Sequence, residues 1–263
     1  MIREVLADEI PVKIRELESY LPFSANAIHS LKNFSHRAKL LSDEDHGLIT
    51  VIFKSNYNKH IWYSPIIWIF GNLGHIDEIF QILFKEYFGG FTALAFGENF
   101  TPFPYAGLKF YEEDLMLLHK LKITPKRIPS RLDEGYALES LKLSSDFNGE
   151  IGQLEIEREK NFLKERETYG FVDNGMLISR GSIMSQASGY SGVGGFITNP
   201  NFRNMGYGTD MVSYISQKVL ERGNLPFLTV RSDNRTALSL YSKIGFSKIG
   251  KVIFIDYKTG SVP

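Results

Sequence analysis

A segment with the residue types needed to bind a phosphate group lies in the last third of the chain. The sequence Arg203-Asn-Met-Gly-Tyr-Gly-Thr209 follows a strand-like run, and a helix is expected to begin within it. The first turn of a helix leaves backbone N–H groups unpaired and carries the positive end of the helix dipole, so it favours an anion. Glycines at 206 and 208 would let phosphate oxygens reach the backbone, because glycine has no Cβ. Arg203 could add a charged donor and Thr209 a hydroxyl group, so the segment is typical of a phosphate or pyrophosphate site.

This glycine pattern is weak evidence by itself. Two glycines one residue apart also occur in ordinary strand-to-helix turns. The segment is not a P-loop, since Gly-Lys-Ser/Thr is missing, and it is not a dinucleotide fingerprint, since Met211 stands in place of the third glycine. A second motif is needed to decide between a structural turn and a ligand site.

That second motif lies at residues 228–246. It reads as a strand, then Asn234, then a helix that contains Tyr241, and then Gly245-Phe246. The first motif resembles the Arg/Gln-x-x-Gly-x-Gly/Ala loop of the GNAT acyltransferases, and the second is similar to that family's second signature. One helix and one strand separate the two, as in the family. Residues 131–263 therefore resemble a GNAT domain, which implies a mixed α/β (α+β) fold with splayed parallel strands flanked by helices.

The resemblance implies a role for most of these residues. In the family, the strand before the loop splays from its parallel neighbour, and the pantetheine arm of coenzyme A lies between the two strands. The positions implied to bind the cofactor are Phe196, Ile197 and Thr198 through their backbone, the loop residues Arg203, Asn204, Met205, Gly206, Tyr207, Gly208 and Thr209, and Asn234 from the other side. Asn234 could equally be only the N-cap of the following helix.

Tyr241 matches the residue that often protonates the leaving thiolate in this family. A phenol suits that role because its ordinary pKa, near 10, is close to that of an alkyl thiol. The alternative is a tyrosine that only packs in the core or caps the helix.

The general base of the family has no counterpart in the strand before the loop. Members often carry a glutamate there, but residues 192–199 contain no carboxylate. The nearest carboxylates in the sequence, none of which matches a motif, are Glu139, Glu155 and Asp173. Three residues upstream of the strand could orient an amine or a water molecule: Ser185, Ser188 and Tyr190. A base is not required if the amine arrives neutral.

The N-terminal half shows a similar order of elements without the motif. An apolar run at 61–70 is followed by Gly71-Asn-Leu-Gly74, a helix and a strand. This order is weak evidence for a repeat, because alternating β and α elements are common. The chain also resembles two-part GNAT proteins of the glycine N-acyltransferase-like type, in which a divergent first half precedes the cofactor-binding half. We therefore divide it into 1–130, a degenerate GNAT-like domain without coenzyme A binding, and 131–263, with the boundary in the Pro-rich segment 125–133.

Hydrophobic periodicity predicts the elements that position these residues. In the N-terminal half we expect helices at 4–20, 25–41, 75–88 and 112–121, and strands at 48–54, 61–70 and 91–96. In the C-terminal half we expect helices at 155–167, 207–222 and 236–244, and strands at 136–141, 169–172, 176–179, 182–187, 192–198, 227–230 and 251–257.

Composition excludes several classes of protein. Lys+Arg and Asp+Glu both number 30, so no overall basic charge indicates nucleic acid or an anionic membrane. The absence of cysteine excludes a disulfide scaffold, a thiolate zinc site and an acyl-cysteine intermediate. The six histidines, at 29, 36, 46, 60, 75 and 119, show no zinc-motif spacing, so no metal is expected. The longest apolar run is about half of a membrane span, and we expect a soluble, cytoplasmic monomer or homodimer.

Two functions from different classes remain. The first is an N-acetyltransferase that moves an acetyl group from acetyl-coenzyme A directly to an amine in a ternary complex, the acceptor being a small-molecule amine or a peptide. The alternative is a non-catalytic acyl-coenzyme A sensor, which the missing carboxylate favours.

Overall fold

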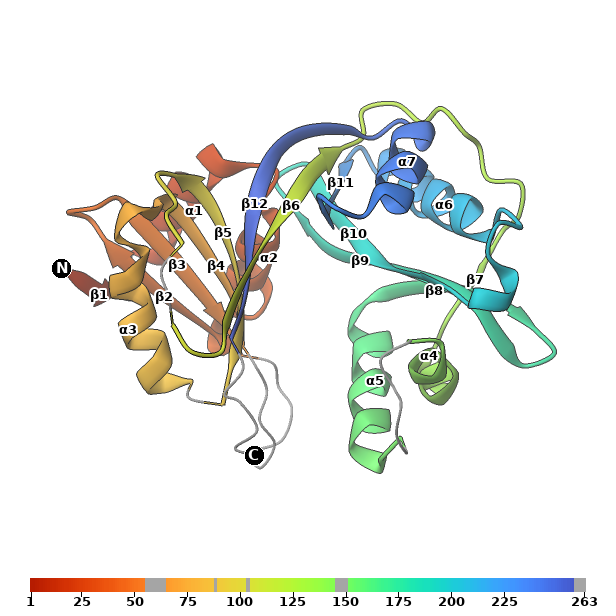
Figure 1. Ribbon diagram of the computed structural model, residues 1–263, viewed down its shortest axis with the longest axis horizontal. Coiled ribbons are helices and arrows are strands. Elements are labelled where there is room, and N and C mark those ends of the chain that lie inside the picture. The colour runs from red at the N-terminus through yellow and green to blue at the C-terminus, as the bar shows by residue number, and fades with distance from the viewer. Residues whose placement is uncertain (55–64, 88, 103–104, 145–150, 258–263) are drawn as a thin grey trace. The chain divides into compact units, whose positions relative to one another are not determined.

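The computed structural model describes residues 1–263 apart from 55–64, 88, 103–104, 145–150 and 258–263 (Figure 1). The chain forms two compact units. Unit 1 comprises Met1–Leu115, Arg231–Asp233 and Ile249–Pro263, and unit 2 comprises Met116–Val230 and Asn234–Lys248. Strands β6 (Leu108–Leu117) and β12 (Ser247–Tyr257) contribute residues to both units. The domain boundary after residue 130 divides the chain by sequence motif and stays a prediction.

Unit 1 contains a mixed sheet with the strand order β1-β2-β3-β4-β5-β12-β6. Neighbours from β1 to β4 are antiparallel, β4 and β5 are parallel, and β12 is antiparallel to β5. The remaining strands are β1 (Ile2–Glu4), β2 (Ala38–Asp43), β3 (Leu48–Phe53), β4 (Ile66–Asn72) and β5 (Phe91–Glu98). The helices are α1 (Ile10–Leu17), α2 (Ala25–Asn33) and α3 (Ile76–Glu86), with 3-10 turns η1 (Glu18–Tyr20), η2 (Ser35–Arg37) and η3 (Leu73–His75).

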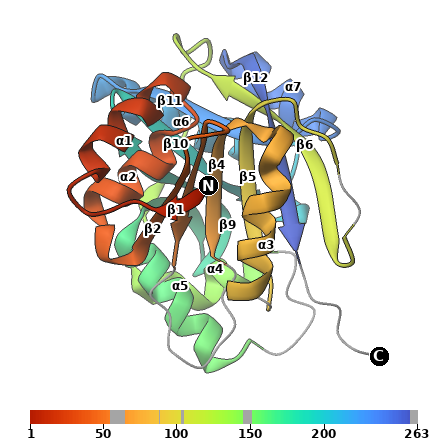
Figure 2. The same cartoon turned by 90° about the vertical axis from the view of Figure 1, so that its left-hand side faces the viewer.

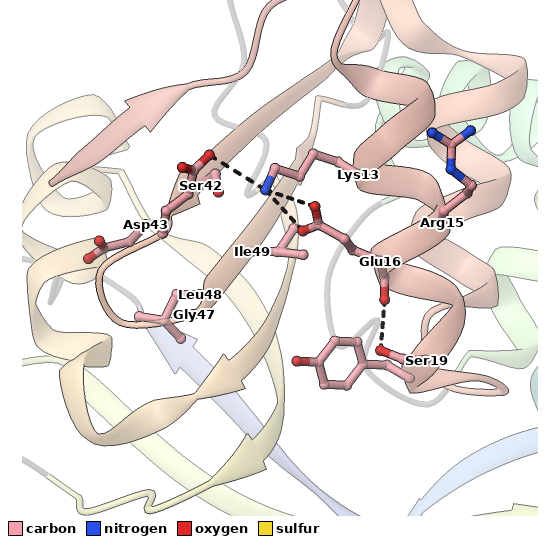
Figure 3. Close-up of a pocket in the computed structure, with 11 residues that line it drawn as sticks. Lys13, Arg15, Glu16, Ser19, Ser42, Asp43, Gly47, Leu48 and Ile49 are labelled. Carbon is pink, nitrogen blue, oxygen red and sulfur yellow. Dashed lines mark hydrogen bonds and ion pairs between the residues drawn. The ribbon is translucent and has the colours of Figure 1, made fainter.

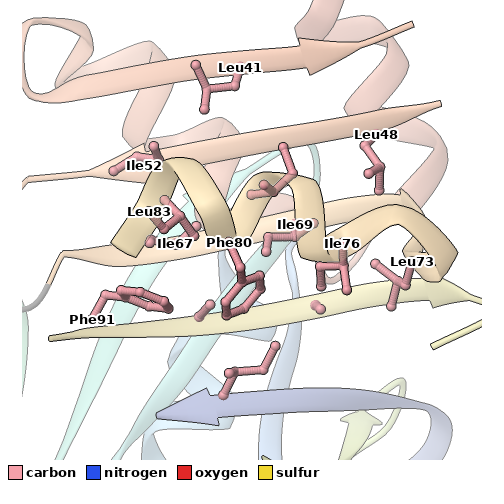
Figure 4. Close-up of a cluster of buried hydrophobic side chains, with 14 of the residues drawn as sticks. Leu41, Leu48, Ile52, Ile67, Ile69, Leu73, Ile76, Phe80, Leu83 and Phe91 are labelled. Atoms are coloured by element: carbon pink, nitrogen blue, oxygen red, sulfur yellow. The ribbon is translucent and has the colours of Figure 1, made fainter. Parts of the chain in front are cut away.

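Helices cover both faces of this sheet. Ile67 and Ile69 of β4 lie in one buried cluster with Phe80 of α3 (Figure 4). Successive residues of a strand point to opposite faces, and Phe70 accordingly meets Phe23, with ring centroids 5.5 Å apart, on the side of α1 and α2. The run of buried residues in β4 thus reflects burial on both faces, with α3 on one and α1 and α2 on the other (Figure 2).

Unit 2 contains a sheet in which β7, β8, β9 and β10 are successive antiparallel neighbours and β11 is parallel to β10. Leu177 of β9 packs with the cluster of α4 and α5, whereas Ile178 packs with that of α6, so this sheet is also covered on both faces. The strands are β7 (Ser130–Arg131), β8 (Glu167–Asp173), β9 (Met176–Ala187), β10 (Tyr190–Thr198) and β11 (Leu225–Arg231). The helices are α4 (Ala137–Leu143), α5 (Gln153–Glu165), α6 (Tyr207–Glu221) and α7 (Arg235–Ile244), with 3-10 turns η4 (Glu134–Tyr136) and η5 (Pro200–Phe202).

The two units share one order of elements. In unit 1, three antiparallel strands (β2, β3, β4) are followed by α3 and by β5, which is parallel to β4. In unit 2, β8, β9 and β10 are followed by α6 and by β11, which is parallel to β10. This correspondence agrees with the two-part architecture expected from the sequence.

Two predicted elements are wrong. The expected helix at 112–121 is instead largely strand β6, whose consecutive buried residues Leu115, Met116 and Leu117 indicate a strand buried on both faces. The expected strand at 136–141 belongs to η4 and α4, where Ala137 and Leu141 are buried at helical spacing. Both segments are too short for periodicity to separate helix from strand.

Other predicted elements have different bounds. The first two helices are shorter than expected, since the chain before Ile10 and after Asn33 includes strands β1 and β2. The strands expected at 176–179 and 182–187 form one strand, β9, in which the ring of Phe196 occupies the space where Gly181 lacks a side chain. None of the described helices has both the length and the apolar character needed to cross a membrane.

Candidate functional site

Strands β10 and β11 run parallel and then part. Their pairing begins at Tyr190 and ends at Gly192, which lies opposite Phe227. The structure describes every residue of both strands, and β10 continues beyond this pairing to Thr198. β10 also shifts its register against β9 at two places, and Gly195, inside the second shift, has φ +65°. Bulges of this kind bend a strand. The splayed parallel pair expected from the sequence is therefore present in unit 2.

The loop after β10 is exposed and leads into α6. Nε of Arg203 donates a hydrogen bond of 3.4 Å to the carbonyl oxygen of Thr198, at the end of β10. Asn204 (φ +63°) and Gly206 (φ +87°) both adopt left-handed backbone conformations. Left-handed residues at a helix start are typical of anion-binding concavities. Gly206 is the N-cap of α6, and no side chain accepts a hydrogen bond there, so the first N–H groups of the helix remain available to a ligand.

The first turn of α6 packs closely against β10. A Cβ on Gly208 would lie 3.4 Å from Oγ1 of Thr198, so this glycine has a packing role besides any contact with a ligand. The ring of Tyr207 packs against Phe171, with centroids 5.4 Å apart, and only its backbone is suited to face a ligand. Met205 precedes the turn with an exposed side chain, and Thr209 is partly buried.

A basic residue that the motifs did not include lies beside this loop. Nη1 of Arg127 is 2.6 Å from Oδ2 of Asp210, in the first turn of α6, and Oδ1 of Asp210 accepts a bond of 2.9 Å from the backbone N–H of Lys126. The guanidinium lies 4.6 Å from the ring centroid of Tyr207, and a Cβ on Gly206 would be 3.4 Å from Nη1. Asp210 thus fixes Arg127 next to the candidate phosphate loop.

The end of β10 is only partly engaged with β9. Oγ of Ser179 donates to the carbonyl oxygen of Ile197 at 2.9 Å and lies 2.9 Å from Oγ1 of Thr198. Phe196 falls inside the register shift, so its backbone has no residue opposite it on the fully described strand β9. Among the three residues expected to pair with pantetheine, Phe196 is the one that lies inside the irregular part of β10.

Asn234 and Tyr241 lie on α7. Oδ1 of Asn234 accepts a hydrogen bond of 3.1 Å from the N–H of Ala237, so the N-cap role considered for it is present. The half-buried ring of Tyr241 lies between Phe196 and Phe246, with centroids 6.2 and 5.9 Å away. Burial raises the pKa of Tyr241 to about 12, so the phenol is protonated at neutral pH.

The carboxylates nearest to the motifs in sequence lie on other elements. Glu139 is on α4 and pairs with Lys142 at 2.7 Å, and Glu155 is on α5, 3.7 Å from Arg158. Asp173 ends β8 at an exposed turn. The three polar residues considered for orienting an amine, Ser185, Ser188 and Tyr190, lie at the β9–β10 connection, where the parallel pair is still closed.

The corresponding region of unit 1 has no such opening. β4 and β5 pair over seven consecutive positions, from Ile66 opposite Thr92 to Asn72 opposite Glu98. A strand pair closed along its length has no space for a ligand arm between its backbones. In this respect unit 1 differs from unit 2, where β10 and β11 part.

Unit 1 has a cavity of about 610 Å³ of its own, between α1 and the β2–β3 hairpin (Figure 3). Nζ of Lys13 lies inside it, 2.9 Å from Glu16 and 3.8 Å from Glu44. Lys13 thus forms ion pairs with both carboxylates. These three residues therefore leave no unpaired charge in the cavity that would indicate a ligand.

Comparison with known proteins finds one family model and a set of similar solved structures. Residues 169–255 match the family model described as FR47-like protein. No curated protein is significantly similar in sequence. Several solved structures superpose on nearly the whole chain, and three of them illustrate the similarity. A Drosophila protein has a TM-score of 0.69 at 13% identity, over 97% of this chain and 98% of its own.

The other two solved structures are described as GNAT proteins. An acetyltransferase from the GNAT family of Colwellia psychrerythraea has a TM-score of 0.58 at 12% identity, over 98% of this chain and all of its own. A tandem GNAT protein from the clavulanic acid biosynthesis pathway has a TM-score of 0.60 at 12% identity, over 100% of this chain and 99% of its own. At these identities the likeness concerns the fold. The chain has the GNAT fold, and residues 169–255 match the FR47-like family model.

Proposed function

We propose that unit 2 binds acetyl-coenzyme A and transfers its acetyl group to an amine. The observation that carries the proposal is the parting of β10 from β11 after Gly192, next to an exposed loop and an uncapped helix start. The pantetheine arm would lie along Phe196, Ile197 and Thr198, and metal ions have no part in the proposal.

The pyrophosphate would lie on the first turn of α6. The backbone N–H groups of residues 207–209 would donate to its oxygens, with the loop 203–206 around it. Arg203 and Arg127 would each supply a guanidinium, which matches phosphate geometry better than an ammonium does. Asn234 would face the cofactor from α7 in addition to capping that helix.

The chemical step would rest mostly on positioning. No cysteine can carry the acyl group, so the amine would attack the thioester directly within a ternary complex. Tyr241 would donate a hydrogen bond to the departing thiolate. With its pKa raised to about 12, full proton transfer to a thiolate of lower basicity is uphill, so the phenol stabilises the thiolate chiefly as a donor.

The acceptor would be a small-molecule amine or a peptide that arrives neutral, since β10 carries no carboxylate to act as a base. The same observation favours the alternative, an acyl-coenzyme A sensor without turnover. The division into domains 1–130 and 131–263, the cytoplasmic location and the monomeric or homodimeric state belong to the proposal as well.

The binding site is tested by Gly206→Glu with Gly208→Glu. These changes place side chains and negative charge in the loop, and we expect coenzyme A binding by titration calorimetry to be lost. Gly250→Glu, on β12, is the matched control, since its backbone is not left-handed and a Cβ there would lie 3.6 Å from Phe96, an ordinary contact distance. Unchanged affinity in the double variant would refute the site. Thioester consumption with a panel of amines separates enzyme from sensor, because binding without turnover for any amine supports the sensor.

A further inference from the structure

Two histidines from distant parts of unit 1 meet at one end of its sheet. His46 lies in the turn between β2 and β3, and His75 ends η3 and precedes α3. The turn and the end of β4 approach closely, because a Cβ on Gly71 (φ +118°) would overlap the carbonyl oxygen of Gly47. This approach places the imidazole rings in contact, with centroids 3.8 Å apart and planes 16° apart.

A carboxylate completes the group. Glu78 lies in the first turn of α3, with Oε1 3.9 Å from Nδ1 of His75. One ligand atom from each of His46, His75 and Glu78 lies within 4.8 Å of the other two. Side chains at this separation can reach a common ion after a small rotation, since metal–ligand bonds of about 2 Å leave ligand atoms about 3–3.5 Å apart.

A second carboxylate orients the first histidine. Oδ2 of Asp43, whose side chain is fully buried, lies 2.7 Å from Nδ1 of His46. This contact keeps Nδ1 as the protonated nitrogen of a neutral ring and leaves the lone pair of Nε2 free. Carboxylate–histidine pairs of this kind orient the ligand and raise its basicity in metal sites.

We propose that His46, His75 and Glu78 bind a divalent transition-metal ion such as Zn²⁺, with Asp43 as the residue that positions His46. Two imidazoles and one carboxylate suit zinc and its neighbours rather than calcium or magnesium, which prefer oxygen ligands. Three protein ligands leave a fourth position for water or another ligand. The site lies in unit 1, where the parallel strands β4 and β5 pair at seven consecutive positions. It does not depend on the proposed acetyl transfer.

Binding requires the stacked rings to turn. The lone pairs of two nearly parallel rings lie in separate planes and cannot both point at one ion, whereas the ligands of a tetrahedral ion are about 109° apart. The side chains of His46 and His75 are 30% and 44% exposed, so the rings have room to rotate.

Charges around the group are mixed. Glu44 and Asp45 precede His46 in the sequence, and Asp77 precedes Glu78. Arg3 and Lys13 face Glu44, and the amino group of Met1 faces Asp43 and Asp45. The positive end of the α3 dipole opposes a cation, and the two acidic residues of its first turn offset this effect.

The test uses the full chain freed of metal by dialysis against a chelator. We expect one equivalent of Zn²⁺ to bind in competition with a chromophoric indicator, and Co²⁺ to give a visible absorption band of a nitrogen-ligated site. His75→Ala and Glu78→Gln are each expected to weaken Zn²⁺ binding at least about 10-fold, and Asp43→Asn about 10- to 100-fold. His119→Ala, an exposed histidine of unit 2, is the control and keeps wild-type affinity.

Glu78→Gln removes one charge from an exposed position, so this variant is expected to fold, which circular dichroism checks. The proposal is overturned if the wild-type chain does not compete with the indicator for Zn²⁺. It is also overturned if Zn²⁺ and Co²⁺ bind His75→Ala and Glu78→Gln as tightly as wild type. Coenzyme A binding in these variants is expected to match wild type, which separates this site from that of unit 2.

Discussion

Replacing Arg127 with alanine is expected to weaken coenzyme A binding about 10- to 100-fold. Arg127 neutralises Asp210, whose side chain is only 5% exposed and lies in the same helical turn as the proposed phosphate site. Without the guanidinium, a carboxylate would face the pyrophosphate. Two unit charges about 6 Å apart interact by about 3 kcal/mol at an effective dielectric constant of about 20. The Arg127 side chain is 44% exposed, so screening reduces this to about 1.4–2.8 kcal/mol, a factor of about 10–100 in affinity.

A double-mutant cycle separates the two ways in which Arg127 could act. If it only neutralises Asp210, the variant Arg127→Ala with Asp210→Asn recovers wild-type affinity. If its guanidinium also contacts a phosphate, as its place beside Gly206 indicates, the double variant stays at least about 5-fold weaker, because a charged hydrogen bond contributes about 1.5–3 kcal/mol. We expect the second result, measured by titration calorimetry.

The matched control is another arginine–carboxylate pair on the same helix. Arg222 follows the last turn of α6 and forms two hydrogen bonds of 2.7 Å to Glu167. It lies about 22 Å along the helix from its start, so Arg222→Ala should leave coenzyme A affinity unchanged. An Arg127→Ala variant that binds coenzyme A as tightly as Arg222→Ala would refute the reasoning.

Two further predictions concern single side chains. Tyr241→Phe should lower kcat about 10- to 100-fold while the Kd for coenzyme A changes less than about 2-fold; equal turnover would remove Tyr241 from the mechanism. Burial raises the pKa of Tyr241 to about 12, so ionisation of this phenol should not limit kcat below about pH 11. An inflection near pH 8 in the wild-type plot of kcat against pH, absent in Tyr241→Phe, would contradict this expectation. The hydrogen bond from Arg222 lowers the pKa of Glu167, so this pair stabilises the fold above the unfolded pKa of about 4.3 and loses its effect as pH falls through the lower folded pKa. Glu167→Gln should therefore flatten the acid side of the denaturation profile, and an unchanged slope between pH 5 and 3 would refute the assignment.

Local sequence signals were sufficient to predict the loop and the helix start of the proposed cofactor site. Gly206 could be recognised as a helix start because glycine, strand and helix periodicity coincide within about ten residues, and α6 begins at Tyr207 as expected. The resemblance likewise predicted an irregular strand before the loop, and the structure shows register shifts there. These features depend on neighbouring residues, so a single sequence reveals them.

The missed features depend on contacts distant in sequence. Arg127 lies 83 residues before Asp210 in a segment assigned only as a boundary, and no periodicity or motif there indicates its partner. His46 and His75 are brought together by the close approach of Gly71 to a turn, which histidine spacing does not show. The segment of β6 was mistaken for a helix because good helix formers such as Glu112, Leu115 and Met116 are held in a strand by tertiary contacts.

The position of β12 in the sheet affects the order in which the parts of the chain can fold during synthesis. Ile253–Tyr257 pair with β5 in unit 1, and β12 lies between β5 and β6 there. The first 115 residues therefore leave the ribosome without the strand that lies between β5 and β6. That position is filled only after all of unit 2 has been translated, so the N-terminal part of the chain completes its fold last.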